Sequence, residues 1–540
     1  MNLYIDHELR FSPSAELVKA LKPLVTWNNP ERERVARSGR SFAHVSPDWC
    51  ALEQEDGNAT ARLPRGLLPQ LQEAARLAGV VMKPIPRVTW DPTAPRIPLA
   101  SLGVTLRDYQ VEAVDLCVSR RQGVVVLPCG AGKTVTGAAF LLSLNQRAAV
   151  VTPSVDIAEQ WVATIRRLKP DAIVRTVHGG EAWSDAPLVP GEIAVGVDDS
   201  LSTKRAEKIL ASAGALVTDE THRVASKTWR GIVALCPARW RIGLTATPER
   251  ADGWNMLLPC LLGPVLLERS QQWLVSQGYL AQPTIYGILT GAEASATDYR
   301  TVTRCPGCHK EIEVNEGEVR LGIARCKKVV TIRRRRDVCG TPIPPGAEIS
   351  KSFSVGRAGS RVAKDPDRLA QVVRVCEWAM GQDRDVLVLV PRLETVGRLQ
   401  KELRALGVPA VGLTGAENRK VRKSALEAIG RREYRVLVAT QLADEGLDLP
   451  RMDTLVNTSA GVAAGNAAQR VGRVCRPCGN DPLVFDFVDG GAAYARQWRA
   501  RSLAYRKAYG AVAMPEKRPI RLADALARCT VKGTNMELFR

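Results

Sequence analysis

Two parts of this chain alternate short β-rich runs with helical stretches, and that alternation restricts the fold more than any other feature of the sequence. In the first part, helical stretches such as Thr134–Leu144 and Ile157–Leu168 separate five short apolar runs. The runs are Gly123–Leu127, Ala148–Val151, Ile193–Val197, Ala215–Thr218 and Arg241–Leu244. Because alternating units of this kind build parallel sheets covered by helices on both faces, the first part is expected to be an α/β domain.

A second series of β-rich runs begins after about residue 365 and indicates a second α/β domain. Its members are Val386–Val390, Val436–Ala439, Thr454–Asn457 and Leu483–Phe487. We expect the two α/β domains to span residues 96–285 and 359–495. Residues 1–95 would form a small accessory domain that ends in a proline-rich run suited to a stiff linker. Residues 286–358 break the alternation and are interpreted as an insertion, and residues 496–540 as a basic, helical tail.

A glycine-rich segment joins the first β-rich run to the helix that follows it. The segment reads Leu127-Pro128-Cys129-Gly130-Ala131-Gly132-Lys133-Thr134. Gly130 and Gly132 allow backbone N–H groups to curl around phosphate oxygens. Lys133 would place its ammonium group on the β- and γ-phosphates, and Thr134 would offer its hydroxyl to Mg²⁺. The general pattern has glycine where this chain has Leu127. A chance glycine-rich turn is the alternative, but the strand-to-helix context predicts an ATP site.

An acidic segment, Asp219-Glu220-Thr221-His222, ends a later apolar run of the same domain. In open α/β sheets, ligands bind beyond the carboxyl ends of the strands, so this segment should emerge near the phosphates. Asp219 would hold Mg²⁺ through water, and Glu220 would orient or deprotonate the attacking water. We include His222 among the candidate catalytic residues. The pair of segments predicts ATP hydrolysis.

Together these segments resemble the DExH branch of the superfamily 2 helicases and translocases. That resemblance implies two tandem RecA-like parallel-sheet domains, and further motifs follow in the family's order. In the first domain they imply adenine recognition by Arg107 and Gln110, contact with the nucleic-acid backbone by Thr152 and Pro153, and coupling of hydrolysis to domain movement by Thr245 and Thr247.

In the second half, Ala439 to Asp448 resembles the motif that senses both nucleotide and strand; its candidate residues are Thr440, Gly446 and Asp448. Gln469-Arg470-Val471-Gly472-Arg473-Val474-Cys475-Arg476 resembles the motif whose arginines reach the γ-phosphate. The resemblance thus assigns Gln469, Arg473 and Arg476 to catalysis. Positive charge delivered to the transferring phosphoryl group stabilises the transition state, which gives this assignment a physical basis.

Within the superfamily, the phosphate loop and the segment Thr247-Pro248-Glu249-Arg250-Ala251-Asp252-Gly253 resemble the xeroderma pigmentosum B, phage UvsW and restriction-type helicases. That group carries Arg-Glu-Asp where this chain has Arg250-Ala251-Asp252, so a strand-separating role at this position is not expected to be retained intact. Arg250 stays a candidate for nucleic-acid contact. Since these relatives act on DNA, the resemblance favours DNA over RNA.

Four cysteines in the insertion suggest a metal site. Cys305-Pro306-Gly307-Cys308 is half of a zinc ribbon, because a tight turn of this kind brings two thiolates to one ion. Cys339, followed by Gly340, resembles a second knuckle, and Cys326 or His309 would supply the fourth ligand. We expect structural Zn²⁺, with free thiols as the alternative. Basic residues at 327–328 and 333–336 would contact phosphates or form a solvated surface.

Net charge points to a polyanionic partner. The chain has 76 Lys and Arg against 56 Asp and Glu, a formal net charge of +20. Such an excess favours nucleic acid, although charge alone leaves a merely basic surface open. The segment Met1–Phe11 lacks the apolar core of a signal peptide, and no long apolar run suggests a membrane span. The thirteen cysteines are expected to be reduced. Together these features predict a cytoplasmic protein.

These patterns predict an ATP-dependent DNA helicase or double-strand DNA translocase. The alternatives are an RNA helicase and a zinc-dependent nucleic-acid-binding ATPase that acts as a clamp. The sequence contains no second catalytic constellation suggestive of a nuclease. Cleavage, if it occurs in the pathway, is therefore expected to come from a partner protein of repair or defence.

Overall fold

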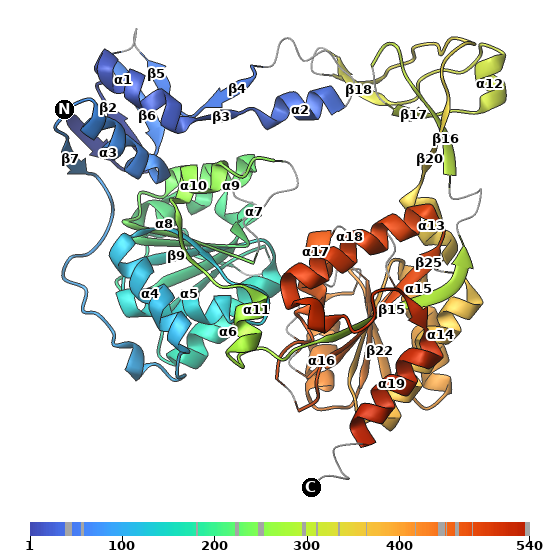
Figure 1. The fold of residues 1–540 in the computed structure, drawn as a ribbon. Coiled ribbons are helices and arrows are strands. Elements are labelled where there is room, and N and C mark those ends of the chain that lie inside the picture. The colour runs from blue at the N-terminus through green and yellow to red at the C-terminus, as the bar shows by residue number, and fades with distance from the viewer. Residues whose placement is uncertain are drawn as a thin grey trace. The chain divides into compact units, whose positions relative to one another are not determined.

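The computed structural model describes residues 1–540 except 38–45, 56–58, 180–181, 222–225, 247–252, 294–298, 309–310, 333–334, 363, 416, 441–448, 450, 459–463, 478 and 535–540. The described chain divides into two compact units (Figure 1), one built mainly from residues 1–269 and the other from residues 270 onwards.

The first unit begins with a small α/β domain that has its own core. Its elements are β1 (Asn2–Ile5), β2 (Glu8–Phe11), α1 (Ala15–Leu21), β3 (Thr26–Asn28), α2 (Pro30–Arg37), β4 (Asp48–Cys50), β5 (Glu53–Glu55), β6 (Thr60–Pro64), α3 (Leu68–Leu77) and β7 (Lys83–Pro86). Five of the strands form one sheet in the order β5-β6-β2-β1-β7. Leucines of α1 and α3, including Leu17 and Leu71, pack against strand residues such as Leu9 and Leu63. The accessory region therefore buries a hydrophobic core of its own.

Two buried arginines attach this small domain to the α/β domain that follows. The guanidinium of Arg65 donates hydrogen bonds to the carbonyls of Asp6 (3.1 Å) and Ala238 (2.6 Å). The guanidinium of Arg241 donates in the same way to the carbonyl of His7 at 3.1 Å. Burial lowers the pKa of Arg65 to about 9 and that of Arg241 to about 10. Each guanidinium thus joins carbonyl groups from both domains.

The α/β domain of the first unit contains a seven-stranded, wholly parallel sheet in the order β10-β11-β9-β12-β13-β8-β14. The strands are β8 (Gln122–Val126), β9 (Ala148–Thr152), β10 (Val174–Val177), β11 (Ile193–Val197), β12 (Ala215–Asp219), β13 (Trp240–Thr245) and β14 (Val265–Glu268). The helices are α4 (Asp108–Arg120), α5 (Lys133–Leu144), α6 (Val155–Leu168), α7 (Asp198–Leu201), α8 (Glu207–Ser212), α9 (Lys227–Leu235) and α10 (Leu257–Leu262). All five predicted strands are confirmed within a residue or two at their ends.

Alternate strand residues face the two helical layers, which explains why the runs are apolar throughout. Val124, Ala149 and Leu216 share one buried cluster with Leu210 of α8 and Trp229 of α9. On the other side, α4 packs against α5 and α5 against α6. A central parallel strand is buried on both faces, so it shows no polar alternation.

The second unit contains another seven-stranded, wholly parallel sheet, in the order β22-β23-β21-β24-β25-β15-β26. The strands are β15 (Thr284–Glu293), β21 (Val386–Val390), β22 (Ala410–Leu413), β23 (Val436–Thr440), β24 (Thr454–Asn457), β25 (Leu483–Gly490) and β26 (Ile520–Arg521). The helices are α11 (Gln271–Ser276), α13 (Val355–Val362), α14 (Pro366–Gly381), α15 (Leu393–Ala405), α16 (Arg419–Gly430), α17 (Ala464–Val471), α18 (Ala492–Tyr509) and α19 (Leu522–Thr534). The four strands predicted here are confirmed.

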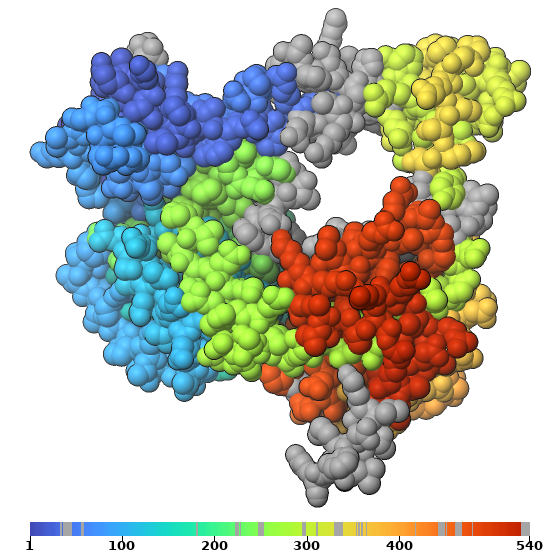
Figure 2. Space-filling view, viewed as in Figure 1, coloured from blue at the N-terminus to red at the C-terminus, as the bar shows by residue number. Residues whose placement is uncertain are grey.

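Two segments belong to this second sheet although the sequence suggested otherwise. Strand β15 starts at Thr284 and pairs with β25, so residues 286–293 are part of the sheet and not of the insertion. Helix α18 crosses the boundary drawn at residue 496 and buries Trp498 and Tyr505 against the sheet, and β26 pairs with β15. Figure 2 accordingly shows the red part of the chain, up to residue 534, packed on the second unit. The many arginines of α18 concealed this buried face.

The insertion forms small antiparallel elements. A three-stranded sheet is made of β16 (Tyr299–Arg304), β17 (Glu311–Glu313) and β20 (Ser350–Phe353); β18 (Val329–Ile332) pairs with β19 (Arg335–Val338), and α12 spans Glu316–Arg320. Its core is small and includes Cys305, Cys326, Ile312 and Ile343. Within the described residues, we find no helix with the length and apolar character needed to cross a bilayer.

Candidate ATP site and cysteine cluster

The glycine-rich loop lies between β8 and α5, as predicted. Gly130 (φ 81°) and Gly132 (φ 77°) adopt left-handed backbone conformations that L side chains rarely adopt. The N–H of Ala131 donates to the carbonyl of Pro128 at 3.2 Å and closes a turn. Leu127 is buried, and its N–H donates to the carbonyl of Thr245 at 2.9 Å. The backbone at this position therefore continues the β8–β13 pairing by one residue, and the leucine that departs from the general pattern is part of the buried core.

Residues in the first turn of α4 support this loop. The Tyr109 hydroxyl donates to the carbonyl of Ala131 at 2.6 Å, and the Gln110 side-chain amide donates to the same carbonyl at 3.2 Å. The N–H of Arg107 donates to Oε1 of Gln110 at 2.9 Å. A Cβ at Gly132 would lie only 2.6 Å from the Gln110 amide nitrogen, so this contact also requires glycine. Gln110 thus holds the loop, and its adenine-reading role stays a prediction; the support from Tyr109 was not anticipated.

Asp219, at the end of β12, is the best-defined acidic group of the site. Its Oδ1 accepts a hydrogen bond from the N–H of Glu220 (2.9 Å), and its Oδ2 accepts one from the Trp161 indole N–H (2.8 Å). Burial, and then the negative charge of Glu220, raise the pKa of Asp219 to about 6, whereas the Lys133 ammonium opposes this rise. Lys133, Asp219 and Glu220 are therefore close enough for their charges to interact, which is the grouping predicted from the sequence.

The turn after β12 gives Glu220 an unusual backbone conformation. Glu220 has a φ of 49°, a left-handed conformation that is uncommon for a residue other than glycine. The Thr221 hydroxyl contacts the carbonyls of Thr218 and Leu244, both at 2.9 Å. This hydroxyl links the acidic turn to β13, whose last residue, Thr245, is fully buried. The turn is thereby connected to the strand that leads into residues 246–250.

The remaining residues predicted for the site of the first unit differ in burial, and some of them lie outside the described residues. His222, Thr247 and Arg250 lie outside the described residues. Thr152 is fully buried, and its hydroxyl lies 3.2 Å from the carbonyls of both Ser154 and Gly196. The Thr152 hydroxyl is therefore bonded inside the domain, and contact of this strand end with the nucleic-acid backbone stays a prediction. Pro153 beside it is partly exposed and keeps the predicted role.

The second unit contains the arginine motif on and just after α17. Gln469, Arg473 and Arg476 are partly exposed, whereas Arg470 is buried. Thr440 is buried at the end of β23, and Gly446 and Asp448 lie outside the described residues.

A buried polar network surrounds Asp486 of β25 and connects these elements. Arg470 donates to Asn457 (3.2 Å), whose amide donates to Oδ1 of Asp486 (3.1 Å). Arg501 and the Tyr505 hydroxyl, both on α18, donate to Oδ2 of Asp486 at 2.8 Å. Burial raises the pKa of Tyr505 well above its ordinary value. Asp486 thus joins α17, which carries the arginine motif, to β24 and α18.

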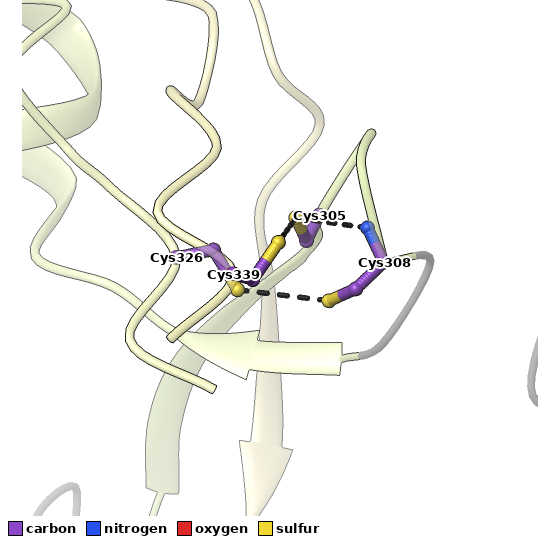
Figure 3. A group of neighbouring side chains, drawn as sticks. All are labelled: Cys305, Cys308, Cys326 and Cys339. Atoms are coloured by element: carbon purple, nitrogen blue, oxygen red, sulfur yellow. Dashed lines mark hydrogen bonds between the residues drawn. The ribbon is translucent and has the colours of Figure 1, made fainter. Parts of the chain in front are cut away.

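The four cysteines of the insertion converge, as Figure 3 shows. Their sulfur atoms all lie within 4.8 Å of one another. The closest pairs are Cys305 with Cys339 at 3.8 Å and Cys308 with Cys326 at 3.6 Å. Four sulfurs at about 2.3 Å from one tetrahedral ion would be separated by about 3.8 Å. The separations of the closest pairs therefore match a tetrahedral thiolate site.

Backbone turns present these thiols to one point. The Cys308 N–H donates to the Cys305 sulfur at 3.5 Å, and Gly340 (φ 65°) donates its N–H to the Cys326 carbonyl at 3.0 Å. Hydrogen bonds from Thr341 lower the pKa of Cys339 to about 6, whereas burial raises that of Cys326 to about 12. Cys326 occupies the fourth corner of the cluster. His309, the alternative ligand, lies outside the described residues.

Two family models match the chain over the parts that contain these motifs. Residues 103–250 match "Type III restriction enzyme, res subunit", and residues 367–478 match "Helicase conserved C-terminal domain". The chain has two RecA-like domains. One carries a glycine-rich phosphate loop and an acidic turn, and the other carries an arginine motif. This combination defines a superfamily 2 ATPase. The chain belongs to that superfamily of helicases and is an ATP hydrolase.

Its relatives are of the XPB type. The chain is 26% identical over 410 residues to the "DNA 3'-5' translocase XPB2" of Sulfurisphaera tokodaii, covering 75% of this chain and 86% of that protein. It is 27% identical over 462 residues to the "DNA 3'-5' helicase XPB" of Kineococcus radiotolerans, covering 83% of this chain and 69% of that protein. The Saccharomyces cerevisiae Dbp5 structure bound to RNA and ADP BeF3 is 13% identical, with a TM-score of 0.52, covering 80% of this chain and 93% of that chain; this likeness concerns the fold alone.

Proposed function

We propose that this chain is an ATP-dependent DNA translocase or helicase. The observation that carries the proposal is the grouping of Lys133, Asp219 and Glu220 beyond the carboxyl ends of β8 and β12, the two parallel strands that flank β13, beside a glycine-rich loop. A protein that only binds a nucleotide does not require a carboxylate directed at water. The relatives named DNA 3'-5' translocase and helicase supply the reason to favour DNA and 3'-5' polarity.

The residues of the first unit suit the following roles. Lys133 would hold the β- and γ-phosphates, and the loop N–H groups would hold the remaining phosphate oxygens. Asp219, a hard oxygen ligand next to the phosphate loop, fits Mg²⁺ held through water. Bound Mg²⁺ would neutralise charge developing on the phosphates. Glu220, whose position is set by its backbone conformation, would orient the attacking water.

The second unit is proposed to complete the reaction. Arg473 and Arg476 would supply positive charge to the γ-phosphate when the two units close. Because hydrolysis would then depend on closure, repeated closing and opening would move the units along the nucleic acid.

The test is ATP turnover by the full chain with single-stranded DNA, duplex DNA, forks, junctions and matched RNA, paired with strand displacement on each. We expect DNA to raise turnover well above RNA of the same sequence and length. Stronger stimulation by RNA would support the RNA-helicase alternative and contradict the proposal. The DNA with the highest turnover identifies the preferred structure.

A second test separates an enzyme from an ATP-dependent clamp. Glu220→Gln keeps the size and a hydrogen-bonding side chain but removes the base, so turnover should fall by roughly 10²- to 10⁴-fold while a nonhydrolysable ATP analogue still binds. Asp199→Asn, which changes an exposed carboxylate of the same domain, is the matched control and should keep full turnover. Full turnover by the Glu220→Gln variant would contradict the assignment.

We propose further that Cys305, Cys308, Cys326 and Cys339 hold structural Zn²⁺. The sulfur separations fit tetrahedral coordination, for which zinc is the usual ion with four thiolates. The small core of the insertion gives the metal a folding role. Exposed Lys327 and Lys328 follow Cys326 directly and would lie on a phosphate backbone if the insertion contacts DNA.

A further inference from the structure

Trp161 lies on α6, the helix that directly follows the partly exposed Pro153. The Thr152 hydroxyl contacts the carbonyl of Ser154, and the Ser154 hydroxyl accepts the N–H of Ile157 in the first turn of α6. Trp161 follows one turn later and is fully buried. The strand end proposed to contact nucleic acid is therefore linked to Trp161 by hydrogen bonds and one turn of helix.

The Trp161 indole contacts two other parts of the ATP site, the Asp219 carboxylate and helix α5. Its N–H donates to Oδ2 of Asp219 at 2.8 Å. A Cβ added at Gly137, on the phosphate-loop helix α5, would lie 2.4 Å from the indole ring and 2.7 Å from Leu244 of β13. The ring is therefore packed closely against α5 and near the strand that leads into the coupling segment. Since Gly137 has no side chain, the indole has room to reach Asp219.

The hydrogen bond to Trp161 decides how the Asp219 carboxylate is oriented. Oδ1 accepts the N–H of Glu220, and Oδ2 accepts the indole N–H. With one donor on each oxygen, these two hydrogen bonds hold the plane of the carboxylate. Hydrogen bonds of this kind to metal-binding groups typically change metal affinity or activity by roughly 10- to 100-fold.

We infer that Trp161 is a positioning residue that couples nucleic-acid contact at the Thr152–Pro153 strand end to the magnesium-holding carboxylate of Asp219. A shift of α6 when nucleic acid binds moves the indole N–H and so reorients Asp219 relative to the phosphate loop. This coupling rests on the proposed function, because it assumes that nucleic acid binds at that strand end. It supplies a physical route by which DNA stimulates ATP hydrolysis.

The test replaces Trp161 with phenylalanine, which keeps an aromatic ring and removes the N–H donor. The chain offers a matched control: Trp229 is equally buried and donates its indole N–H to Oδ2 of Asp198 at 2.8 Å, away from the phosphate loop. Binding of a fluorescent, nonhydrolysable ATP analogue to the full chain is titrated with Mg²⁺, with and without a DNA duplex. ATP turnover is measured under the same conditions.

We expect Trp161→Phe to require roughly 10- to 100-fold more Mg²⁺ for half-maximal analogue binding and to lose most of the stimulation by DNA. Trp229→Phe should match the wild-type chain in both. Wild-type Mg²⁺ dependence and wild-type stimulation in folded Trp161→Phe would overturn the inference. If DNA fails to stimulate even the wild-type chain, the proposed function fails instead.

Two further measurements apply if Trp161→Phe melts far below Trp229→Phe. Gly137→Ala keeps the indole N–H but places a methyl group against the ring, so it should raise the Mg²⁺ requirement in the same direction. In the wild-type chain, DNA should lower the Mg²⁺ concentration needed for analogue binding, since coupling between two sites is reciprocal. Stimulation of turnover by DNA without any change in that concentration would overturn the inference.

Discussion

The negative charge that Asp219 needs for its proposed magnesium-holding role lowers the stability of the fold. Burial and Glu220 raise its pKa to about 6, from 3.8. A carboxyl whose pKa is higher in the folded chain binds its proton more tightly there. The contribution of this carboxyl to the free energy of unfolding is therefore largest below about pH 4. That contribution is lost as the pH rises through 6. At neutral pH, the metal-free site holds a charge that the fold disfavours.

Asp219→Asn should consequently stabilise the metal-free chain while abolishing ATP turnover. At pH 8 the gain in the free energy of unfolding should approach, at most, about 3 kcal/mol, because each pKa unit corresponds to about 1.4 kcal/mol. Near pH 4 the gain should largely vanish. Thermal melting with a chelator present, at both pH values, measures the effect, and Asp199→Asn at an exposed site serves as the control. Equal gains at both pH values would show that charge burial is not the cause.

The candidate site residues that can be predicted from the sequence are those that directly follow a recognisable strand in the chain. Lys133, Asp219 and Glu220 follow apolar strands, and the carboxyl ends of parallel strands meet at one edge of a sheet. Trp161 and Tyr109 act through contacts with residues 58 and 22 positions away, respectively. Nothing local distinguishes a tryptophan that binds a carboxylate from one that fills a core, so only the folded structure identifies them.

At the scale of elements, Asp486 of β25 holds α17 and α18 in place. Asp486→Asn removes the carboxylate that faces buried Arg501 and the Tyr505 hydroxyl. An unpaired buried charge costs about 3–5 kcal/mol, so the second unit should unfold at much lower denaturant concentration. The exposed Asp481→Asn is the control and should be nearly neutral. Denaturant unfolding measures the stability. Both variants should still bind the ATP analogue through the first unit. Unchanged stability of Asp486→Asn would contradict this account.

The cysteine cluster gives a second prediction at this scale. Cys326→Ser should lower zinc from about one ion per chain to near zero and expose the insertion to proteolysis, because the metal supplies most of its folding energy. Cys529→Ser, at a half-buried site outside the cluster, should keep its zinc. Metal content by elemental analysis and limited proteolysis are the measurements. His309→Ala should also keep zinc, and its loss there would assign the fourth ligand to histidine.

Helices and strands can be predicted where an apolar run is continuous. The limits of a domain cannot be predicted where charged residues obscure the buried face of a helix. Strands such as Val386–Val390 are apolar throughout and were placed correctly. Helix α18 has a charged face with Arg496 and Arg499, and its buried Arg501 is neutralised by Asp486 from another element. A sequence pattern cannot reveal that pairing, so the predicted end of the second domain, at residue 495, falls inside α18.

At the scale of the whole molecule, the parts of the proposed reaction belong to two different units. The phosphate loop and acidic turn are in the first unit, and the arginine motif is in the second. Under the proposed mechanism, ATP binding would need only the first unit, whereas hydrolysis would need both. That division predicts variants in which binding and turnover separate completely.

Arg473→Ala and Arg476→Ala should each reduce ATP turnover by about 10³-fold or more while leaving the affinity for a nonhydrolysable ATP analogue within a few-fold of the wild-type value. The loss arises because the γ-phosphate keeps its lysine but loses the charge that would stabilise the transition state. Arg496→Ala, which removes an exposed arginine of α18 in the same unit, is the control for general loss of positive charge and should keep full turnover. Single-turnover hydrolysis with saturating DNA is the decisive measurement, since it is independent of product release. Full turnover in both arginine variants would mean that the second unit does not take part in phosphoryl transfer, and the first unit would then have to hydrolyse ATP alone.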